Sequence, residues 1–262
     1  MDNLQTVWEP YTSGHAPCVG SLLLIAGPCV IESYETTFAI ASYLKLLTNR
    51  YRIPFLFKAS YDKANRSSIS SYRGPGPTEG LKILYCIKRE LGIRITSDVH
   101  RVSEVERAAE VLDVIQIPAF LSRQTDLLTA VAATGRPINI KKGQFMSPYA
   151  MGLVAEKCKG SQVMFTERGT FFGYNDLVVD MRSISIMKGF GAKVIFDATH
   201  SAGARKAVPR LAMAAVAAGA DGVFLETHPN PDKALCDGPS SIQMHDIDAL
   251  LSKLIQIHKI LI

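Results

Sequence analysis

The sequence predicts a single-domain α/β protein with the (β/α)8 TIM-barrel fold. Eight short apolar, β-branched runs recur along the chain, and a longer amphipathic or Ala-rich segment follows each of them. Polar or charged side chains stand where most of these runs end, as at the rim of a barrel. The 262 residues are 47% hydrophobic and 20% charged, enough for one substantial core. An open doubly wound sheet is the competing architecture, but no GxGxxG follows the first run.

The apolar runs define the strands in order. They read SLLLIA, IPFLFK, IRITS, VIQI, PINIK, QVMFT, KVIFD and GVFLE, at residues 21–26, 53–58, 93–97, 114–117, 137–141, 162–166, 193–197 and 222–226. Helices are predicted in every gap. The clearest are residues 206–219, with the run LAMAAVAAGA, and residues 246–260, where apolar residues recur at spacings of three and four. Residues 1–20 are predicted to be an extension of unknown role before the catalytic barrel of residues 21–262.

Charge and cysteine usage limit the classes of partner and compartment. The chain has 29 Lys and Arg against 24 Asp and Glu, a net charge of +5 without a long basic block, which favours an anionic small molecule over nucleic acid. The five cysteines are odd in number and lack the spacing of a disulfide scaffold. The apolar stretch at residues 22–31 is short and broken by Gly27 and Pro28. We therefore expect a cytoplasmic protein that does not bind membranes.

Five ionisable or thiol side chains follow apolar runs and are expected to meet at one rim. They are Cys29, Asp98, His200, Glu226 and Asp237. All except Asp98 form a mixed sulfur, nitrogen and oxygen set that suits a borderline divalent ion such as Zn, Fe or Mn. Taken singly, each has an ordinary structural explanation, such as a core thiol or a carboxylate paired with lysine. His228 and Cys236 lie close enough to Glu226 and Asp237 in sequence to leave the ligand assignment open, and His100 is a candidate to support the site from behind Asp98.

The segment after the second predicted strand indicates an anion site. Between residues 58 and 77 it gathers cations, hydroxyls and amides before a Gly/Pro turn, the groups that bind phosphate or carboxylate. An ordinary solvated loop is the alternative. Lys141 and Arg168 are further cations at strand ends, and a doubly anionic ligand would balance them. Structural pairing with Glu167 or Asp98 is the alternative for these two cations.

Several longer sequence motifs resemble those of a known enzyme family. In order they are Ala26-Gly27-Pro28-Cys29, Thr96-Ser97-Asp98-Val99-His100, Asn139-Ile140-Lys141-Lys142-Gly143-Gln144, Thr166-Glu167-Arg168-Gly169, Asp197-Ala198-Thr199-His200-Ser201 and Glu226-Thr227-His228-Pro229. Across residues 21 to about 240 the chain resembles the 3-deoxy-D-manno-octulosonate 8-phosphate (KDO8P) synthases of lipopolysaccharide biosynthesis. The resemblance implies a (β/α)8 transferase that condenses phosphoenolpyruvate with arabinose 5-phosphate and releases phosphate.

The resemblance also implies roles for individual residues. The phosphoenolpyruvate pocket would consist of Lys58, Lys63, Gln116, Ala119, Lys141 and Arg168. The arabinose 5-phosphate end would consist of Asn65, Arg66, Ser67 and Asp98, some of them reaching a neighbouring subunit of a homotetramer. Lys58, Asp98, Lys141 and His200 would be catalytic. The Cys29 thiol is similar to that of the metal-dependent members, whose ligands match Cys29, His200, Glu226 and Asp237.

Two features keep alternatives open. The loop word Lys63-Ala64-Asn65-Arg66-Ser67-Ser68 separates the chain from the related synthase that uses erythrose 4-phosphate (the DAHP synthase type), where the loop reads differently. The Gly-rich mobile loop that the resemblance implies after Ser201 is missing, because the sequence passes directly to Ala202 and the next predicted helix. A non-catalytic sugar-phosphate-binding barrel is therefore a further alternative.

Overall fold

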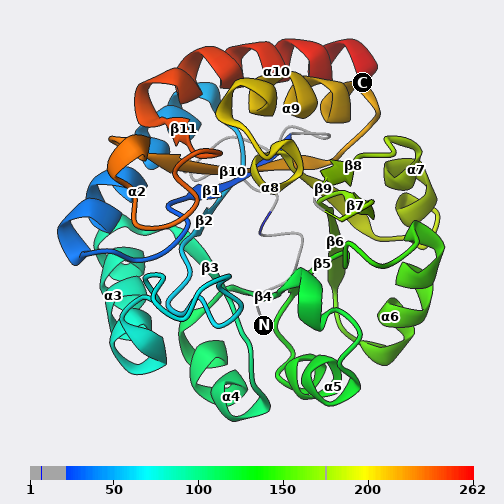
Figure 1. The fold of residues 1–262 in the computed structure, drawn as a ribbon, viewed down its shortest axis with the longest axis horizontal. Helices are drawn as coiled ribbons and strands as arrows, with labels where there is room; N and C mark the ends of the chain where they lie inside the picture. The colour runs from blue at the N-terminus through cyan, green and yellow to red at the C-terminus, as the bar shows by residue number, and fades with distance from the viewer. Residues whose placement is uncertain (1–6, 8–21, 175) are drawn as a thin grey trace.

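The computed structural model describes residues 7, 22–174 and 176–262, and within them the predicted barrel is present (Figure 1). Eight parallel strands close on themselves because the first pairs with both the second and the last. They are β1 (Leu23–Gly27), β2 (Phe55–Lys58), β3 (Arg94–Asp98), β4 (Val114–Ile117), β5 (Ile138–Lys141), β6 (Val163–Glu167), β9 (Lys193–Asp197) and β10 (Gly222–His228). All eight predicted strands are confirmed, with ends that shift by no more than about two residues.

Helices cover the outside of the barrel, as Figure 1 shows. They are α2 (Tyr34–Tyr51), α3 (Gly76–Leu91), α4 (Val102–Val111), α5 (Thr125–Ala133), α6 (Met151–Lys157), α7 (Arg182–Lys188), α9 (Val208–Ala217) and α10 (Ile247–Leu261). Their buried faces pack on the outward side chains of the strands in one large apolar cluster. The two most clearly predicted helices correspond to α9 and α10.

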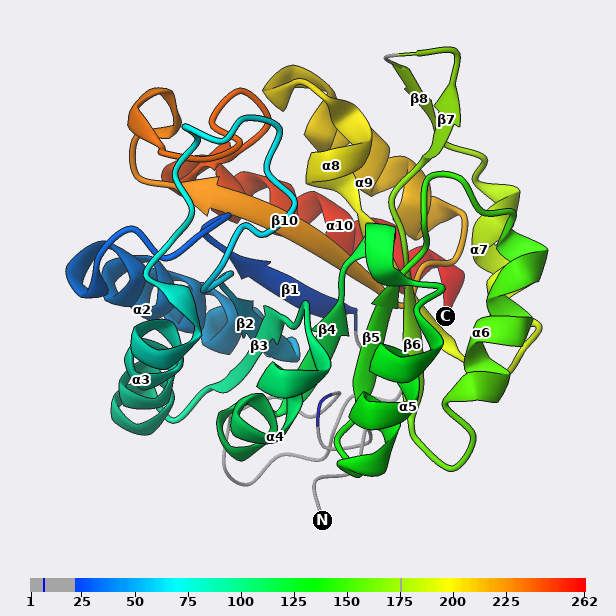
Figure 2. The ribbon, with the colours of Figure 1, turned by 60° about the horizontal axis from the view of Figure 1, so that its bottom comes forward.

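Four smaller elements were not predicted. A hairpin of β7 (Thr170–Phe172) and β8 (Asp176–Val178) follows β6 and projects beyond the barrel (Figure 2). The short helix α8 (Ala198–Ala202) directly follows β9, and β11 (Ile242–Gln243) extends the sheet beside β10. These segments are too short for apolar periodicity to distinguish them from loops.

Inward-facing side chains change character along each strand. Leu56, Val114, Met164, Ile195 and Phe224 belong to the apolar cluster inside the barrel. Because side chains alternate across a strand, the next inward position lies two residues later. On these five strands that position holds Lys58, Gln116, Thr166, Asp197 and Glu226. An apolar plug therefore fills the barrel while polar groups line its carboxyl-terminal end.

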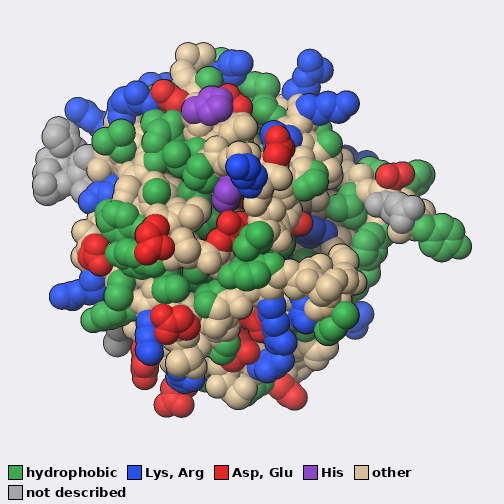
Figure 3. All heavy atoms as spheres, turned by 60° about the vertical axis from the view of Figure 1, so that its left-hand side comes forward, with side chains coloured by type: hydrophobic (Ala, Val, Ile, Leu, Met, Phe, Trp, Pro, Cys, Tyr) green, Lys and Arg blue, Asp and Glu red, His purple; other side chains and the backbone are tan. Residues whose placement is uncertain are grey.

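Three further observations concern the amino-terminal residues, the helices and the surface of the protein. Val7 is buried and packs in the inner apolar cluster; the rest of the predicted extension at residues 1–20 lies outside the described residues. Among the helices that the structure describes, none has the length and apolar character needed to cross a membrane. On the face drawn in Figure 3, acidic and basic side chains are interspersed.

Candidate active site

A polar cavity opens where the strands end, among the loops gathered at the upper end of Figure 2. It is lined by Lys58, Lys63, Asn65, Asp98, Pro118, Ala119, Phe120, Lys141, Gln144, Arg168 and His200. Eight of these are sequence-predicted site residues, contributed by the ends of different strands and the loops beyond them. Pro118, Phe120 and Gln144 were given no role from sequence. The structure thus brings together residues separated by more than 130 positions.

Lys58 and Asp98 form a buried charged pair on one side of the cavity. Lys58 Nζ lies 3.3 Å from Asp98 Oδ2, and Ser60 bridges them by accepting from Lys58 at 2.8 Å and donating to Asp98 at 2.8 Å. Burial alone would raise the pKa of Asp98, but Lys58 and Lys141 outweigh it and hold the pKa well below the usual range. The carboxylate is therefore ionised and acts only as an acceptor. Gly27 permits this packing, because a Cβ there would lie 2.0 Å from the Lys58 carbonyl oxygen.

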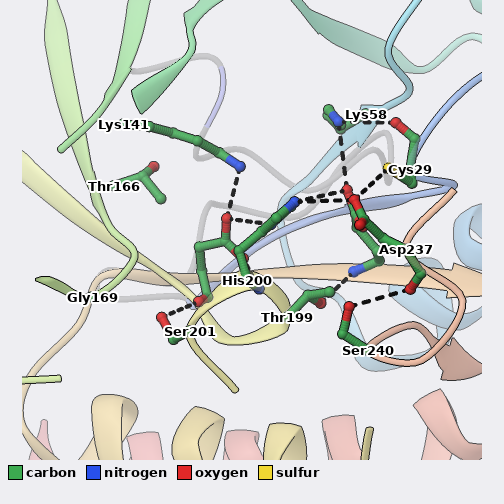
Figure 4. A network of polar contacts seen from close by, with 12 residues as sticks. Cys29, Lys58, Lys141, Thr166, Gly169, Thr199, His200, Ser201, Asp237 and Ser240 are labelled. Atoms are coloured by element: carbon green, nitrogen blue, oxygen red, sulfur yellow. Dashed lines mark hydrogen bonds and ion pairs between the residues drawn. The ribbon is translucent and has the colours of Figure 1, made fainter. Parts of the chain in front are cut away.

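Asp197 links the second cationic wall of the cavity to His200. Its Oδ2 lies 2.7 Å from Lys141 Nζ and 2.8 Å from His200 Nδ1, and its Oδ1 accepts from the His200 backbone N–H at 3.0 Å, capping α8 (Figure 4). Structural pairing, the alternative given for Lys141, is present, but the partner is Asp197 and not Glu167 or Asp98. Glu167 faces outward and lies 3.5 Å from Lys142. Sequence reasoning gave Asp197 no role, although it ends an apolar run as the predicted site residues do.

Lys63 and Arg168 differ from the paired lysines. Neither side chain has a hydrogen bond or ion pair with another described residue, although both line the cavity. Burial lowers the pKa of Arg168. For Lys63 burial acts in the same direction, but the influence of Cys29 and Glu226 prevails and raises the pKa. The cavity thus has two cations available to an anionic ligand.

The four predicted metal ligands also converge. Cys29 Sγ lies 3.0 Å from Asp237 Oδ2, while His200 Nε2 lies 3.6 Å from Glu226 Oε1 and 3.7 Å from Asp237 Oδ2 (Figure 4). His200, Glu226 and Asp237 offer ligand atoms within 4.8 Å of one another. Cys236, which the sequence analysis treated as a neighbour of Asp237, forms a second group of potential metal ligands with Cys29 and Asp237. Its Sγ lies 3.1 Å from Cys29 Sγ.

A strained turn delivers Asp237 to this cluster. Asp237 has a φ of 50°, a left-handed conformation that non-glycine residues seldom adopt. Its carbonyl oxygen accepts from the backbone N–H groups of Ser240 at 3.1 Å and Ser241 at 3.0 Å, which fixes the turn. Arg205 donates to the Gly238 carbonyl oxygen at 2.9 Å and ties the turn to the start of α9. Such strain is characteristic of residues held for function.

The cluster fits a divalent cation. Glu226 is fully buried, yet neither of its carboxylate oxygens has a hydrogen-bond partner among the described residues. Lys58 Nζ lies 3.7 Å from Glu226 Oε1 and balances its charge, but both oxygens keep lone pairs that a metal ion could bind. Asp197 accepts from His200 Nδ1, which leaves Nε2 as the ring atom directed toward Glu226 and Asp237. The thiol of Cys29 completes a donor set suited to Zn, Fe or Mn and unsuited to Mg.

The remaining predicted residues occupy different positions. Gln116 is completely buried beneath the cavity, and both ends of its amide are hydrogen-bonded to Asp98 and Asn139. Arg66 and Ser67 lie farther out on the loop after β2, with Ser67 exposed. This loop is closed by Arg73, which makes a bidentate contact with Asp62 at 2.8 and 3.1 Å.

Comparison with known proteins agrees with this arrangement. The model of the DAHP synthetase I family matches residues 19–262. The chain belongs to the DAHP synthetase I family. Within it, the chain is similar to proteins named 2-dehydro-3-deoxyphosphooctonate aldolase from three bacteria. Identity is 56% to that of Desulfosudis oleivorans (91% of each chain), 55% to that of Syntrophobacter fumaroxidans (90% of this chain, 87% of the relative) and 56% to that of Pelobacter propionicus (89% and 91%).

The shortened segment after Ser201 is continuous in this family member. Helix α8 ends at Ala202, and a 3-10 turn begins at Arg205.

Proposed function

We propose that this chain condenses phosphoenolpyruvate with D-arabinose 5-phosphate and water to give 3-deoxy-D-manno-octulosonate 8-phosphate and inorganic phosphate, in lipopolysaccharide sugar biosynthesis. The observation that carries the proposal is the 56% identity, over 91% of both chains, to a protein named 2-dehydro-3-deoxyphosphooctonate aldolase. The cavity supports it, because four cationic side chains face one space and two of them have no close anionic partner.

The cations and polar groups divide between the two substrates. We assign the carboxylate and phosphate of phosphoenolpyruvate to the side of the cavity with the free cations, and the sugar phosphate to the loop after β2. The phosphoenolpyruvate set is Lys58, Lys63, Gln116, Ala119, Lys141 and Arg168, with Gln116 acting from beneath. The arabinose 5-phosphate set is Asn65, Arg66, Ser67 and Asp98.

The reaction forms one carbon–carbon bond. C3 of phosphoenolpyruvate attacks the aldehyde carbon of the sugar, water adds at C2, and the C–O bond to phosphate breaks as phosphate leaves. Lys58, Lys141 and Arg168 stabilise the negative charge that develops on the phosphate and carboxylate. Asp98 accepts hydrogen bonds from the sugar end, and His200 directs Nε2 toward the ligand cluster. Lys58, Lys141, Asp98 and His200 are held by their neighbours before substrate binds, whereas Arg168 is left to the ligand.

Cys29, His200, Glu226 and Asp237 are proposed to hold one divalent ion, either Zn, Fe or Mn. When bound, the ion would supply Lewis-acid chemistry beside the cavity. Replacing Cys29 by Ala removes the only soft donor of this set, so metal binding should be lost while the far-ultraviolet circular dichroism spectrum stays unchanged. Stoichiometric metal in a folded Cys29→Ala protein would disprove the assignment.

An assay of substrate exchange tests the activity itself. Purified protein is incubated with phosphoenolpyruvate and either arabinose 5-phosphate or erythrose 4-phosphate, and phosphate release is measured. Release with arabinose 5-phosphate alone is expected; a preference for erythrose 4-phosphate, or binding without release, would refute the proposal. Complete removal of the metal should abolish turnover, and turnover that survives would refute the metal requirement.

The free thiols and the exposed hairpin bear on the compartment and the assembly of the enzyme. We propose a cytoplasmic enzyme, since Cys29, Cys86, Cys158 and Cys236 are all free thiols and reducing compartments keep them so. We also propose a homotetramer, consistent with the exposed aromatic side chains Phe171 and Phe172 on the projecting hairpin. Sedimentation measurements test the assembly.

A further inference from the structure

A chain of buried side-chain hydrogen bonds crosses four neighbouring strands beneath the cavity. Thr166 Oγ1 on β6 donates to Asn139 Oδ1 on β5 at 2.7 Å, and Asn139 Nδ2 donates to Gln116 Oε1 on β4 at 2.9 Å. Gln116 Nε2 in turn donates to Asp98 Oδ1 on β3 at 2.8 Å. Thr166, Asn139 and Gln116 are completely buried. We call these three residues and Asp98 the amide relay.

The charge of Asp98 fixes the direction of every bond in the amide relay. An ionised carboxylate accepts but cannot donate, so Gln116 must turn its NH2 group toward Asp98. The Gln116 oxygen then faces Asn139, which must offer its own NH2 group. The Asn139 oxygen is left to accept from the hydroxyl of Thr166. One carboxylate thus sets the orientation of two amides, and each amide in turn restricts the carboxylate.

Filling the barrel does not require this polar layer. Two residues earlier on β4 and β6, the inward positions hold Val114 and Met164, which belong to the inner apolar cluster. Apolar side chains therefore pack well in the layer just below the amide relay. Buried amides add specificity of orientation and are costly when any member loses its partner.

We propose that Thr166 and Asn139 are positioning residues, which act through Gln116 to hold the Asp98 carboxylate in its orientation at the cavity. Loss of the Thr166 hydroxyl leaves the Asn139 oxygen buried without a donor. The Asn139 amide is then free to reverse, and the Gln116 oxygen loses its donor as well. Asp98 consequently loses the constraint that one of its two oxygens receives from β4, although Lys58 and Ser60 still contact the other.

The test compares Thr166→Val, which keeps the shape but lacks the donor, with Thr166→Ser, which keeps the hydroxyl. This part of the test rests on the proposed function. Thr166→Val is expected to lower kcat with phosphoenolpyruvate and arabinose 5-phosphate about tenfold, the equivalent of one buried hydrogen bond. The KM values should change less than about twofold, and Thr166→Ser should restore kcat. Equal losses in both variants, or an unchanged kcat in Thr166→Val, would overturn the inference.

A second measurement does not depend on activity. The side-chain amide NMR signals of Gln116, two hydrogen bonds away from Thr166, are expected to shift in Thr166→Val and to remain in place in Thr166→Ser. Unshifted Gln116 signals in both variants would overturn the relay even if kcat fell. If the wild-type protein released no phosphate, the proposed function would fail while these signals still decided whether the relay exists. Thermal melting of both variants separates either result from loss of the fold.

Discussion

Replacing Asp197 by Asn should weaken metal binding although Asp197 is outside the ligand set. Asn can still cap α8, because one side-chain oxygen can accept from the His200 backbone N–H as Oδ1 does now at 3.0 Å. The other side-chain oxygen, which accepts from His200 Nδ1 at 2.8 Å, becomes an NH2 group. That donor favours the tautomer with the proton on Nε2, the atom directed at the metal ligands. The His200 lone pair is thereby lost to the metal.

The expected loss of metal affinity can be estimated from other proteins in which the hydrogen-bond partner of a metal-binding histidine has been removed. Loss of such a partner typically costs about 10 to 100-fold in metal affinity, equivalent to about 1.4–2.7 kcal/mol. Stability should fall too, since Lys141 loses a buried partner 2.7 Å away, and breaking a buried ion pair typically costs about 3–5 kcal/mol. Competition against a chelator of known affinity measures the first quantity, and denaturant unfolding of the metal-free protein measures the second.

Lys141→Met is the matched control for this experiment. It also breaks the buried ion pair, but it leaves the contact between Asp197 and His200 in place. Metal affinity should therefore stay at or above the wild-type value while the free energy of unfolding falls. Wild-type metal affinity in Asp197→Asn, or an equal loss of affinity in both variants, would refute the reasoning about the tautomer.

Three other predictions concern different parts of the site. Arg73→Ala should raise the KM for arabinose 5-phosphate several-fold with little change in kcat, because the contact with Asp62 closes the loop after β2; steady-state kinetics with an unchanged KM would contradict this. Metal-free protein treated with oxidised glutathione should lose two thiols as Cys29 and Cys236 form a disulfide, since their sulfur atoms lie 3.1 Å apart. Thiol titration should show no such internal disulfide in Cys236→Ser, and its formation there would exclude this pairing. The pKa of Asp98 is lowered by its lysine neighbours against the effect of burial, so its contribution to stability is present above about pH 4 and is lost as the pH falls further. Acid unfolding should show a weaker pH dependence in Asp98→Asn, and equal slopes would count against it.

The strands were predictable because their signal is local. Eight runs of apolar, β-branched residues and the alternation of side chains along a strand are properties of a few consecutive residues. Closure of the sheet followed from their number and even spacing. The β7–β8 hairpin escaped prediction because its strands have three residues each and their aromatic side chains are exposed, so neither alternation nor burial marks them.

The convergence of the candidate site residues was predictable, but their pairings were less so. A residue type at a strand end predicts a rim position, whereas the partner of a rim residue depends on which face of the strand it occupies and on register across the barrel. Thr166 faces inward, so Glu167 must face outward, and it meets Lys142 there instead of Lys141. Strict use of the two-residue period would have excluded Glu167 as a partner of Lys141. It would not have identified Asp197, which lies 56 residues away along the chain.

The short connection after Ser201 changes how the metal cluster is supported. In place of the Gly-rich mobile loop that the family resemblance implied, the chain reaches Arg205 within four residues, and this residue holds the neighbouring turn at three points. Its backbone N–H donates to the Pro239 carbonyl oxygen at 2.8 Å, and its guanidinium donates to the Gly238 carbonyl oxygen at 2.9 Å and to Asp232 at 2.8 Å. These contacts flank Asp237, the one residue among the four proposed ligands whose backbone is strained. A flexible lid in this position could not serve as that brace, so this chain has a fixed support for its ligand cluster where a mobile cover was expected.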